Sequence, residues 1–190
     1  MTSSLEARLE AILRAAPSLM QVLETTRDLD LPDSLIFSGA IYQKVLNHLT
    51  GRTPDYGIKD YDLAYFDMSD LSYTAEDRVI LRVAAAFAPP LSDLVEVRNQ
   101  ARVHLWFETK FGEPYAPLQS SAEALTRFTS PTFAVGARLE GDGQMTIVAP
   151  FGLEDIFDLR LRPNPMRQTN GFMRTALAAQ HRWPELRIEV

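Results

Sequence analysis

Residues 35–66 constrain the fold of this chain more than any other part of the sequence. A short apolar run, 35–37, predicts a buried strand, and Ser38-Gly39 follows it at once. The apolar spacing of residues 39–49 predicts a helix, and residues 61–66 predict a second strand after a loop. A strand, a tight turn, a helix and a strand in this order predict helices packed against a sheet.

The remaining pattern extends the same architecture along the chain. We expect an α+β fold, a short mixed β-sheet with packed helices and a small C-terminal extension. The predicted core spans residues 1–115 and the extension 116–190; the boundary is soft, and one compact domain is the alternative. The further predicted helices lie near 5–16, 18–31, 74–87, 101–107, 121–125 and 170–182, and the further strands near 94–97, 134–139 and 144–148.

Composition excludes several classes of protein. The 190 residues are 46% hydrophobic and 23% charged, which is typical of a globular protein. The absence of cysteine excludes disulfides, thiolate metal sites and cysteine nucleophiles. A net charge of −6 argues against binding to duplex DNA. The first residues lack the pattern of a signal peptide and no apolar run is long enough to span a membrane, so we expect a cytoplasmic protein without membrane contact.

Two aspartates enter the second strand of the unit. Asp60 and Asp62 are two residues apart, so their side chains project to the same face of the strand. Neighbouring carboxylates repel and raise the pKa of each other, and a divalent cation between them removes that conflict. Oxygen ligands of this kind suit Mg²⁺. The turn at Gly39 would present helix N–H groups to an anion.

Each of these residues also has a simpler interpretation. Asp60 and Asp62 are equally consistent with acids at an exposed strand end. Glu96 lies between two valines, where a carboxylate is costly unless it is paired or bound to a metal. The alternatives for Glu96 are an exposed strand face or an ion pair with Arg98 or Arg102.

Cationic side chains offer candidates for binding phosphate. Arg98 and Arg102 follow the strand of Glu96, and either a phosphate contact or a polar helix face explains them. The C-terminal part is rich in arginine, and we expect at least one residue of the set Arg160, Arg162 and Arg174 to line the same cleft as Asp60. We interpret Lys44 as a surface residue, and Trp106 and Trp183 as packing residues.

The combination of an apolar strand, a small-residue turn, an Asp-x-Asp pair and a later acid resembles the polymerase-β-type nucleotidyltransferase superfamily. More closely, the chain resembles a family of poorly characterised bacterial nucleotidyltransferase-like proteins. The interval between Gly39 and Asp60 is longer than is usual for the superfamily, and Ala40 follows the turn where serine is more usual. The segments that carry the closer resemblance are 38–41, 60–62, 65–67, 97–104 and 149–153.

The resemblance implies a Mg²⁺-dependent enzyme that transfers an NMP unit from an NTP to a hydroxyl-bearing acceptor and releases pyrophosphate. Two Mg²⁺ ions are expected with the substrate, bridged by Asp60 and Asp62, with Glu96 holding the ion nearer the acceptor. Ser38 and the N–H of Gly39 are expected to contact the terminal phosphates. The acceptor is a small molecule, a protein or an RNA end, and the negative net charge favours the first two.

Two other functions compete with this one. A catalytically inactive nucleotide-binding or regulatory module of the same fold would bind NTP and metal without releasing pyrophosphate. A hydrolase that uses paired carboxylates as acid and base would need no divalent metal, and it leaves Ser38-Gly39 unexplained.

Overall fold

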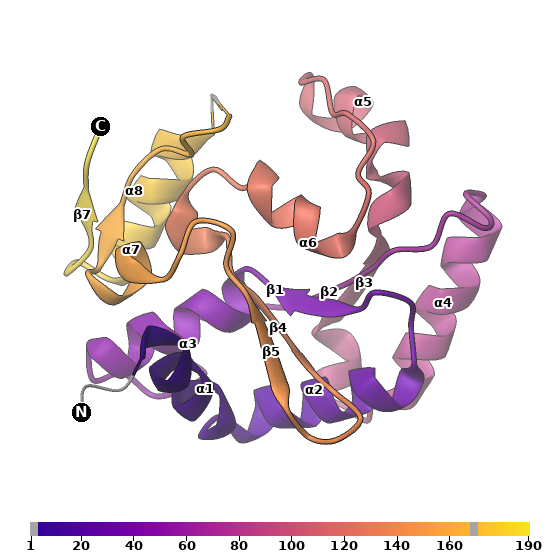
Figure 1. The fold of residues 1–190 in the computed structure, drawn as a ribbon, viewed down its shortest axis with the longest axis horizontal. Helices are drawn as coiled ribbons and strands as arrows, with labels where there is room; N and C mark the ends of the chain where they lie inside the picture. Colours follow the sequence, from indigo (N-terminus) through magenta and orange to yellow (C-terminus); the bar gives the residue numbers. More distant parts are fainter. Residues whose placement is uncertain (1–3, 168–170) are drawn as a thin grey trace.

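The computed structural model describes residues 4–167 and 171–190, which form helices and short strands around one main sheet (Figure 1). The α-helices are α1 (Leu5–Arg14), α2 (Pro17–Leu29), α3 (Gly39–Leu49), α4 (Tyr73–Ala86), α5 (Phe107–Phe111), α6 (Ser121–Ala124), α7 (Glu154–Phe157) and α8 (Phe172–Arg182). The strands are β1 (Leu35–Phe37), β2 (Tyr61–Tyr65), β3 (Val95–Asn99), β4 (Gly136–Leu139), β5 (Met145–Val148), β6 (Arg160–Leu161) and β7 (Arg187–Ile188). The 3₁₀ helices are η1 (Leu91–Asp93), η2 (Gln100–Leu105), η3 (Leu125–Arg127) and η4 (Pro131–Phe133).

The main sheet is mixed, as the sequence predicts. Its strand order is β3-β2-β1-β4-β5, in which β2 and β3 are parallel and the other neighbours are antiparallel. The strands β4 and β5 come from the segment 116–190, so both predicted segments contribute to this sheet. Residues 112–120, around the expected boundary, lie between α5 and α6.

The two faces of the sheet belong to two apolar clusters. Ile36, Leu63 and Val97 share one face and pack into the larger cluster with α1, α2, α3 and α4. Phe37 and Ala64 point the other way and pack against the segment that holds α6 and η3. In Figure 1, α1 and α2 lie on one side of the sheet, and α5 and α6 lie on the other. The second face, with less apolar packing over it, is the one that holds the candidate site.

Two predicted helices differ in detail from the structure. The segment 101–107, predicted as one helix, forms η2 and then α5, with a break at Trp106. Asn99 begins this segment by accepting the N–H of Ala101 on its Oδ1 at 3.1 Å, which favours a tight turn at the start. The helix expected from Thr74 is α4, which is capped by Ser72 through the N–H of Ala75 at 3.2 Å. No helix in the described ranges has the length and apolar character needed to cross a membrane.

Candidate active site

The acidic side chains of the sheet project to one face. In the sheet register, Asp62 of β2 lies beside Phe37 of β1 and beside Glu96 of β3. Residues paired in this way point to the same side, and Asp60, two residues before Asp62, has the same parity. The shared face of the three acids, which the sequence predicts, is therefore confirmed for Asp62 and Glu96 by the register.

Crowding of negative charge perturbs the aspartates. Burial, with the charges of Asp60 and Glu96, raises the pKa of the Asp62 carboxyl to about 7, and Arg98 partly opposes this shift. Burial and Glu96 also raise the pKa of Asp60, while Lys59 and Arg182 lower it. The site thus holds carboxylates that are disfavoured in their ionised form, which is the condition that a bound cation relieves.

The three acids are not gathered into one ligand group. Within 4–167 and 171–190, no three His, Cys, Asp or Glu side chains lie close enough to hold a metal ion together. The side chain of Glu96 is 58% exposed, and its Oε2 lies 4.0 Å from Nη2 of Arg98. Asp60 and Asp62 remain the pair whose chemistry fits a hard divalent cation, because both supply carboxylate oxygen and both are less exposed than Glu96.

Ser38 adopts a backbone conformation that a side chain rarely accepts. Its φ of 61° and ψ of −128° lie in a region normally populated by glycine, and its side chain makes no capping bond to α3. The Ser38 N–H donates to the carbonyl of Val135 at 3.0 Å, and the Ser38 carbonyl accepts from Ile41 and Tyr42. The tight turn between β1 and α3 therefore places its strain at Ser38. Strain of this kind concentrates at binding and catalytic sites.

Gly39 is buried at the first position of α3. Its φ is not in the left-handed region, so the turn does not require glycine for that reason. A Cβ at this position would lie 2.8 Å from Nε2 of Gln43, so a larger residue would displace that side chain. Glycine at position 39 therefore leaves space for the side chain of Gln43. Ser38 is the residue of the turn that lines the cavity.

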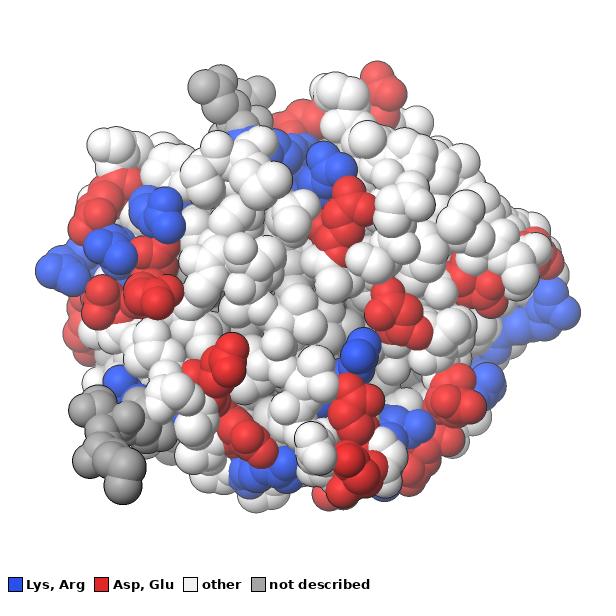
Figure 2. All heavy atoms as spheres, viewed as in Figure 1, with Lys and Arg blue, Asp and Glu red and all other residues white. Residues whose placement is uncertain are grey.

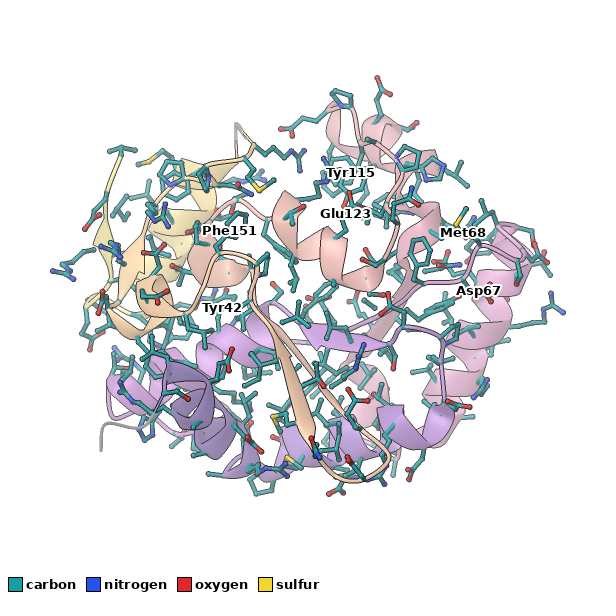
Figure 3. The ribbon with its side chains drawn as sticks, viewed as in Figure 1. Tyr42, Asp67, Met68, Tyr115, Glu123 and Phe151 are labelled. Carbon is teal, nitrogen blue, oxygen red and sulfur yellow. The ribbon has the colours of Figure 1, made fainter. Side chains whose placement is uncertain are left out.

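A cavity of about 1040 Å³ opens over this face of the sheet. Ser38, Asp62 and Arg98 lie at its base, with Tyr42 of α3 beside them. One of its walls is formed by η2 and α5, and the opposite wall is formed by α8. Residues of α6 and η3 line the cavity between these two walls (Figure 1). Figure 1 shows α5 and α8 on opposite sides of α6, and Figure 3 shows Tyr115 and Glu123 near one another between α5 and α6.

Positive charge lines the cavity from several directions. Arg174 lies in the wall formed by α8, in the cavity that Asp62 lines, whereas Asp60 is not part of the described lining. Arg160 and Arg162 are elsewhere, because both donate through Nε to the buried carboxylate of Asp155, at 2.7 and 2.6 Å. The cationic residues in the lining are Arg98, Lys110, Arg127, Arg167, Arg174 and Arg182.

Arg102, predicted as a phosphate contact, does not line the cavity. Its guanidinium forms an ion pair with Glu76 of α4, and its Nε donates to the carbonyl of Leu71 at 2.7 Å. Glu76 is only 3% exposed and requires a cation, which explains where the Arg102 side chain lies. Arg98, by contrast, is half-exposed at the base of the cavity.

The structure corrects the interpretation of Lys44 and adds to the interpretation of Trp106. Lys44 is buried rather than on the surface, because its ammonium pairs with Asp55 and lies over the ring of Tyr61. Trp183 is a core residue, as predicted, and its Nε1 donates to Oδ1 of Asn47 at 2.8 Å. Trp106 packs against Phe111, with ring centroids 6.4 Å apart, and it also lines the cavity and is only partly buried.

Tyr42 is a cavity residue that the sequence prediction missed. Burial raises the pKa of its phenol, Gln43 and Arg182 lower it, and the charge of Asp62 raises it further. Tyr42 lies one helical turn after Ser38, so its spacing from the turn could have predicted that both side chains reach the same cavity. Arg127 and Lys110 carry no comparable signal, since tertiary packing alone brings them to this site.

Similar structures define the class of the fold. A structure described as revealing "a CCA-adding enzyme head domain" is 26% identical, covers 100% of this chain and 97% of that chain, and has a TM-score of 0.77. A CCA-adding enzyme in complex with CTP shares the fold at 13% identity and a TM-score of 0.58, over 96% of this chain and 43% of that chain. The present chain therefore spans less than half of that second protein. The fold is that of a nucleotidyltransferase head domain.

The sequence itself identifies the family. The family model described as "Nucleotidyltransferase" matches residues 24–188, so the chain belongs to this nucleotidyltransferase family. The matched region contains the two aspartates, the Ser38 turn and most of the cavity lining. Curated proteins give no match to this sequence.

Proposed function

We propose that this protein is a Mg²⁺-dependent enzyme that transfers an NMP unit from an NTP to a hydroxyl-bearing acceptor. The observation that carries the proposal is the pair Asp60 and Asp62, whose crowded carboxyl groups have raised pKa values beside a cavity lined by cationic side chains. Family membership and the head-domain fold support the same class of reaction. The NTP is proposed by analogy with the CTP complex of the second similar structure.

The proposed roles follow from position on the sheet face beside the cavity, where Asp62 is the acid of the three that lies in the cavity lining. Asp60 and Asp62 would hold the divalent ions, which would supply positive charge against the negative charge of the phosphates. Ser38 and the first N–H groups of α3 bind the terminal phosphates. Glu96, on the same sheet face but more exposed, is proposed as the carboxylate nearest the acceptor.

The reaction is an in-line displacement. The hydroxyl oxygen of the acceptor bonds to the α-phosphorus, and the bond from that phosphorus to the oxygen bridging the α- and β-phosphates breaks. Pyrophosphate leaves with the bonding electron pair, and the proton of the acceptor hydroxyl passes to water. Arg98 and Arg182 lie in the cavity lining, where they can neutralise the departing phosphates.

One observation favours the inactive module as a second candidate. The described residues contain no group of three acids that would hold a metal ion together, so the third carboxylate of an active site is not assembled. Such a module would bind Mg²⁺ and NTP in the same cavity without turnover.

The experiment supplies each ribonucleoside triphosphate, labelled at the α-phosphate, with Mg²⁺ and a cell extract as the source of acceptor. We expect label to move to an acceptor with wild type, and not with Asp60→Asn, Asp62→Asn or EDTA. Asp93→Asn, which removes an exposed carboxylate just before β3, is the matched control and should transfer label normally. Metal-dependent NTP binding without transfer would support the inactive module. Absence of both binding and transfer would contradict both functions.

A further inference from the structure

Four aromatic rings form one wall of the cavity. Trp106, Phe107, Phe111 and Tyr115 all belong to its lining, and we call this group the aromatic wall. The ring centroids of Phe107 and Tyr115 are 4.4 Å apart, those of Phe107 and Phe111 are 4.7 Å apart, and those of Trp106 and Phe111 are 6.4 Å apart. The wall is therefore a continuous aromatic surface, built by the end of η2, by α5 and by the segment after α5.

The aromatic wall is poorly covered by the rest of the protein. No residue of α5 is buried, although two of its five residues are phenylalanines. Phe111 is 51% exposed, and Trp106 is only partly buried. Partly exposed aromatic rings at a cavity are typical of a binding surface, because covering them with a ligand removes apolar area from water.

Cations lie over the faces of these rings. Nζ of Lys110 is 5.5 Å from the ring centre of Trp106, and the guanidinium of Arg167 is 5.6 Å from that of Phe107. The guanidinium of Arg127 is 5.8 Å from the ring centre of Tyr115. The combination of ring faces and cations suits a ligand that has both a planar ring and a phosphate, since the ring stacks and the phosphate pairs with the cations.

Two of these cations are held in place. Arg127 pairs with Glu123 at 3.1 Å, and Arg167 pairs with Glu113 at 2.7 Å. Nη1 of Arg167 also donates to the carbonyl of Arg127 at 3.0 Å. Cations fixed in this way lose little conformational freedom when an anion binds, which favours binding.

Among the described residues, cationic side chains outnumber acidic ones in the cavity lining. In the proposed function, divalent ions at Asp60 and Asp62 already neutralise much of the NTP. The cavity lining nevertheless contains six Lys and Arg side chains against two acids, Asp62 and Glu113. The three cations over the aromatic wall belong to α5, η3 and the segment before α8. Arg127 and Arg167 are already paired with Glu123 and Glu113, whereas no carboxylate of the described residues lies within ion-pair distance of Lys110, so Lys110 can meet a ligand phosphate directly.

We propose that the aromatic wall is the acceptor subsite, and that the acceptor is a small phosphorylated molecule with a planar ring, of the size of one nucleotide. Its role as acceptor rests on the proposed function. The cavity of about 1040 Å³ is slightly larger than the range of about 300–1,000 Å³ that is typical of pockets for single small ligands.

Charge outside the cavity argues against a nucleic acid chain as the acceptor. The chain has a net charge of −6, and the face shown in Figure 2 carries separate acidic and basic groups around a largely uncharged centre, without a continuous basic stripe. A polyanion needs such a stripe along its backbone, whereas a single nucleotide needs cations only at the cavity. The net charge and the charge distribution on this face (Figure 2) therefore favour a small molecule as the occupant of the aromatic wall.

The test measures binding through Trp106 in the presence of EDTA, so that it does not depend on the metal site. Adenosine monophosphate, adenosine, ribose 5-phosphate and a single-stranded RNA hexamer are titrated separately while tryptophan emission is recorded. Trp183 is fully buried and supplies a constant background, and Trp106→Phe should abolish the change in emission. We expect the monophosphate to bind at least tenfold more tightly than adenosine, which lacks the phosphate, or ribose 5-phosphate, which lacks the planar ring.

Matched variants test the aromatic wall itself. Phe111→Ala removes an exposed ring and should weaken binding of the monophosphate at least tenfold without changing the melting temperature. Leu105→Ala is the control, because Leu105 is 53% exposed on the same segment and does not line the cavity. Lys110→Ala should weaken binding of the monophosphate and leave binding of adenosine unchanged.

The outcomes separate this inference from the proposed function. Unchanged emission with the monophosphate, or equal affinity in wild type and Phe111→Ala, would overturn the inference, even if Mg²⁺-dependent label transfer is found. Tighter binding of the hexamer than of the monophosphate would also overturn it, because the acceptor would then be a nucleic acid. Label transfer that survives Asp62→Asn would refute the proposed function, while nucleotide binding at the aromatic wall would still be measurable in EDTA.

Discussion

Replacing Asp62 by asparagine is expected to stabilise the metal-free protein above pH 7 and to leave its stability unchanged near pH 4. Burial, together with Asp60 and Glu96, raises the pKa of the Asp62 carboxyl from 3.8 to about 7. The unfolded chain ionises near 3.8, so the folded state becomes less stable as pH rises between these values. A shift of about three pH units at about 1.36 kcal/mol per unit corresponds to ~4 kcal/mol of unfolding free energy.

The assay is urea and thermal unfolding of wild type, Asp62→Asn and the control Asp93→Asn at about pH 4 and pH 8.5, first in EDTA. For a chain of this length, ~4 kcal/mol corresponds to a rise in melting temperature on the order of 10 °C at the higher pH. Mg²⁺ should then stabilise wild type at pH 8.5 and have little effect on Asp62→Asn, because only the ionised carboxylate binds the ion. An Asp62→Asn variant that unfolds before wild type in EDTA would refute the reasoning, since Asp62 would then stabilise the fold.

Other substitutions test individual parts of the account. Arg102→Met should lower the unfolding free energy by about 3–5 kcal/mol, because it leaves the carboxylate of Glu76 buried without its cation. A loss below about 1 kcal/mol in urea unfolding would show that this buried ion pair does not stabilise the fold. Ser38→Gly should stabilise the apo protein by about 1 kcal/mol by relieving its positive φ, measured by thermal unfolding. Arg174→Ala should weaken NTP binding and flatten its salt dependence in calorimetry, while exposed Arg187→Ala changes neither.

Local patterns predict the sheet face that carries the candidate site. Alternation along a strand places Asp60 and Asp62 together, and the in-register pairing of β2 with β3 adds Glu96 to the same face. These relations depend on neighbouring residues and on one strand pairing, so the sequence contains enough information for them. The strain at Ser38 is different, because serine rarely adopts this conformation and no local pattern indicates it.

Long-range partners explain what the sequence did not predict. Arg102 binds Glu76 on α4, and Lys44 binds Asp55 in the loop after α3, so neither cation is available to a phosphate in the cavity. The aromatic wall was missed for a similar reason. Partly exposed rings look like core residues in a sequence, and only the tertiary structure brings Tyr115 close to Phe107 and Arg167.

Binding of Mn²⁺ by electron paramagnetic resonance tests most directly whether Asp60 and Asp62 hold the metal that accompanies the nucleotide. Free Mn²⁺ is titrated against wild type, Asp60→Asn, Asp62→Asn and Asp93→Asn, each with a non-hydrolysable NTP present. The account predicts protein-dependent Mn²⁺ binding in wild type and Asp93→Asn, and its loss in both other variants. Equal Mn²⁺ binding in all four proteins would contradict the account, because the metal would then be held by groups other than these two carboxylates.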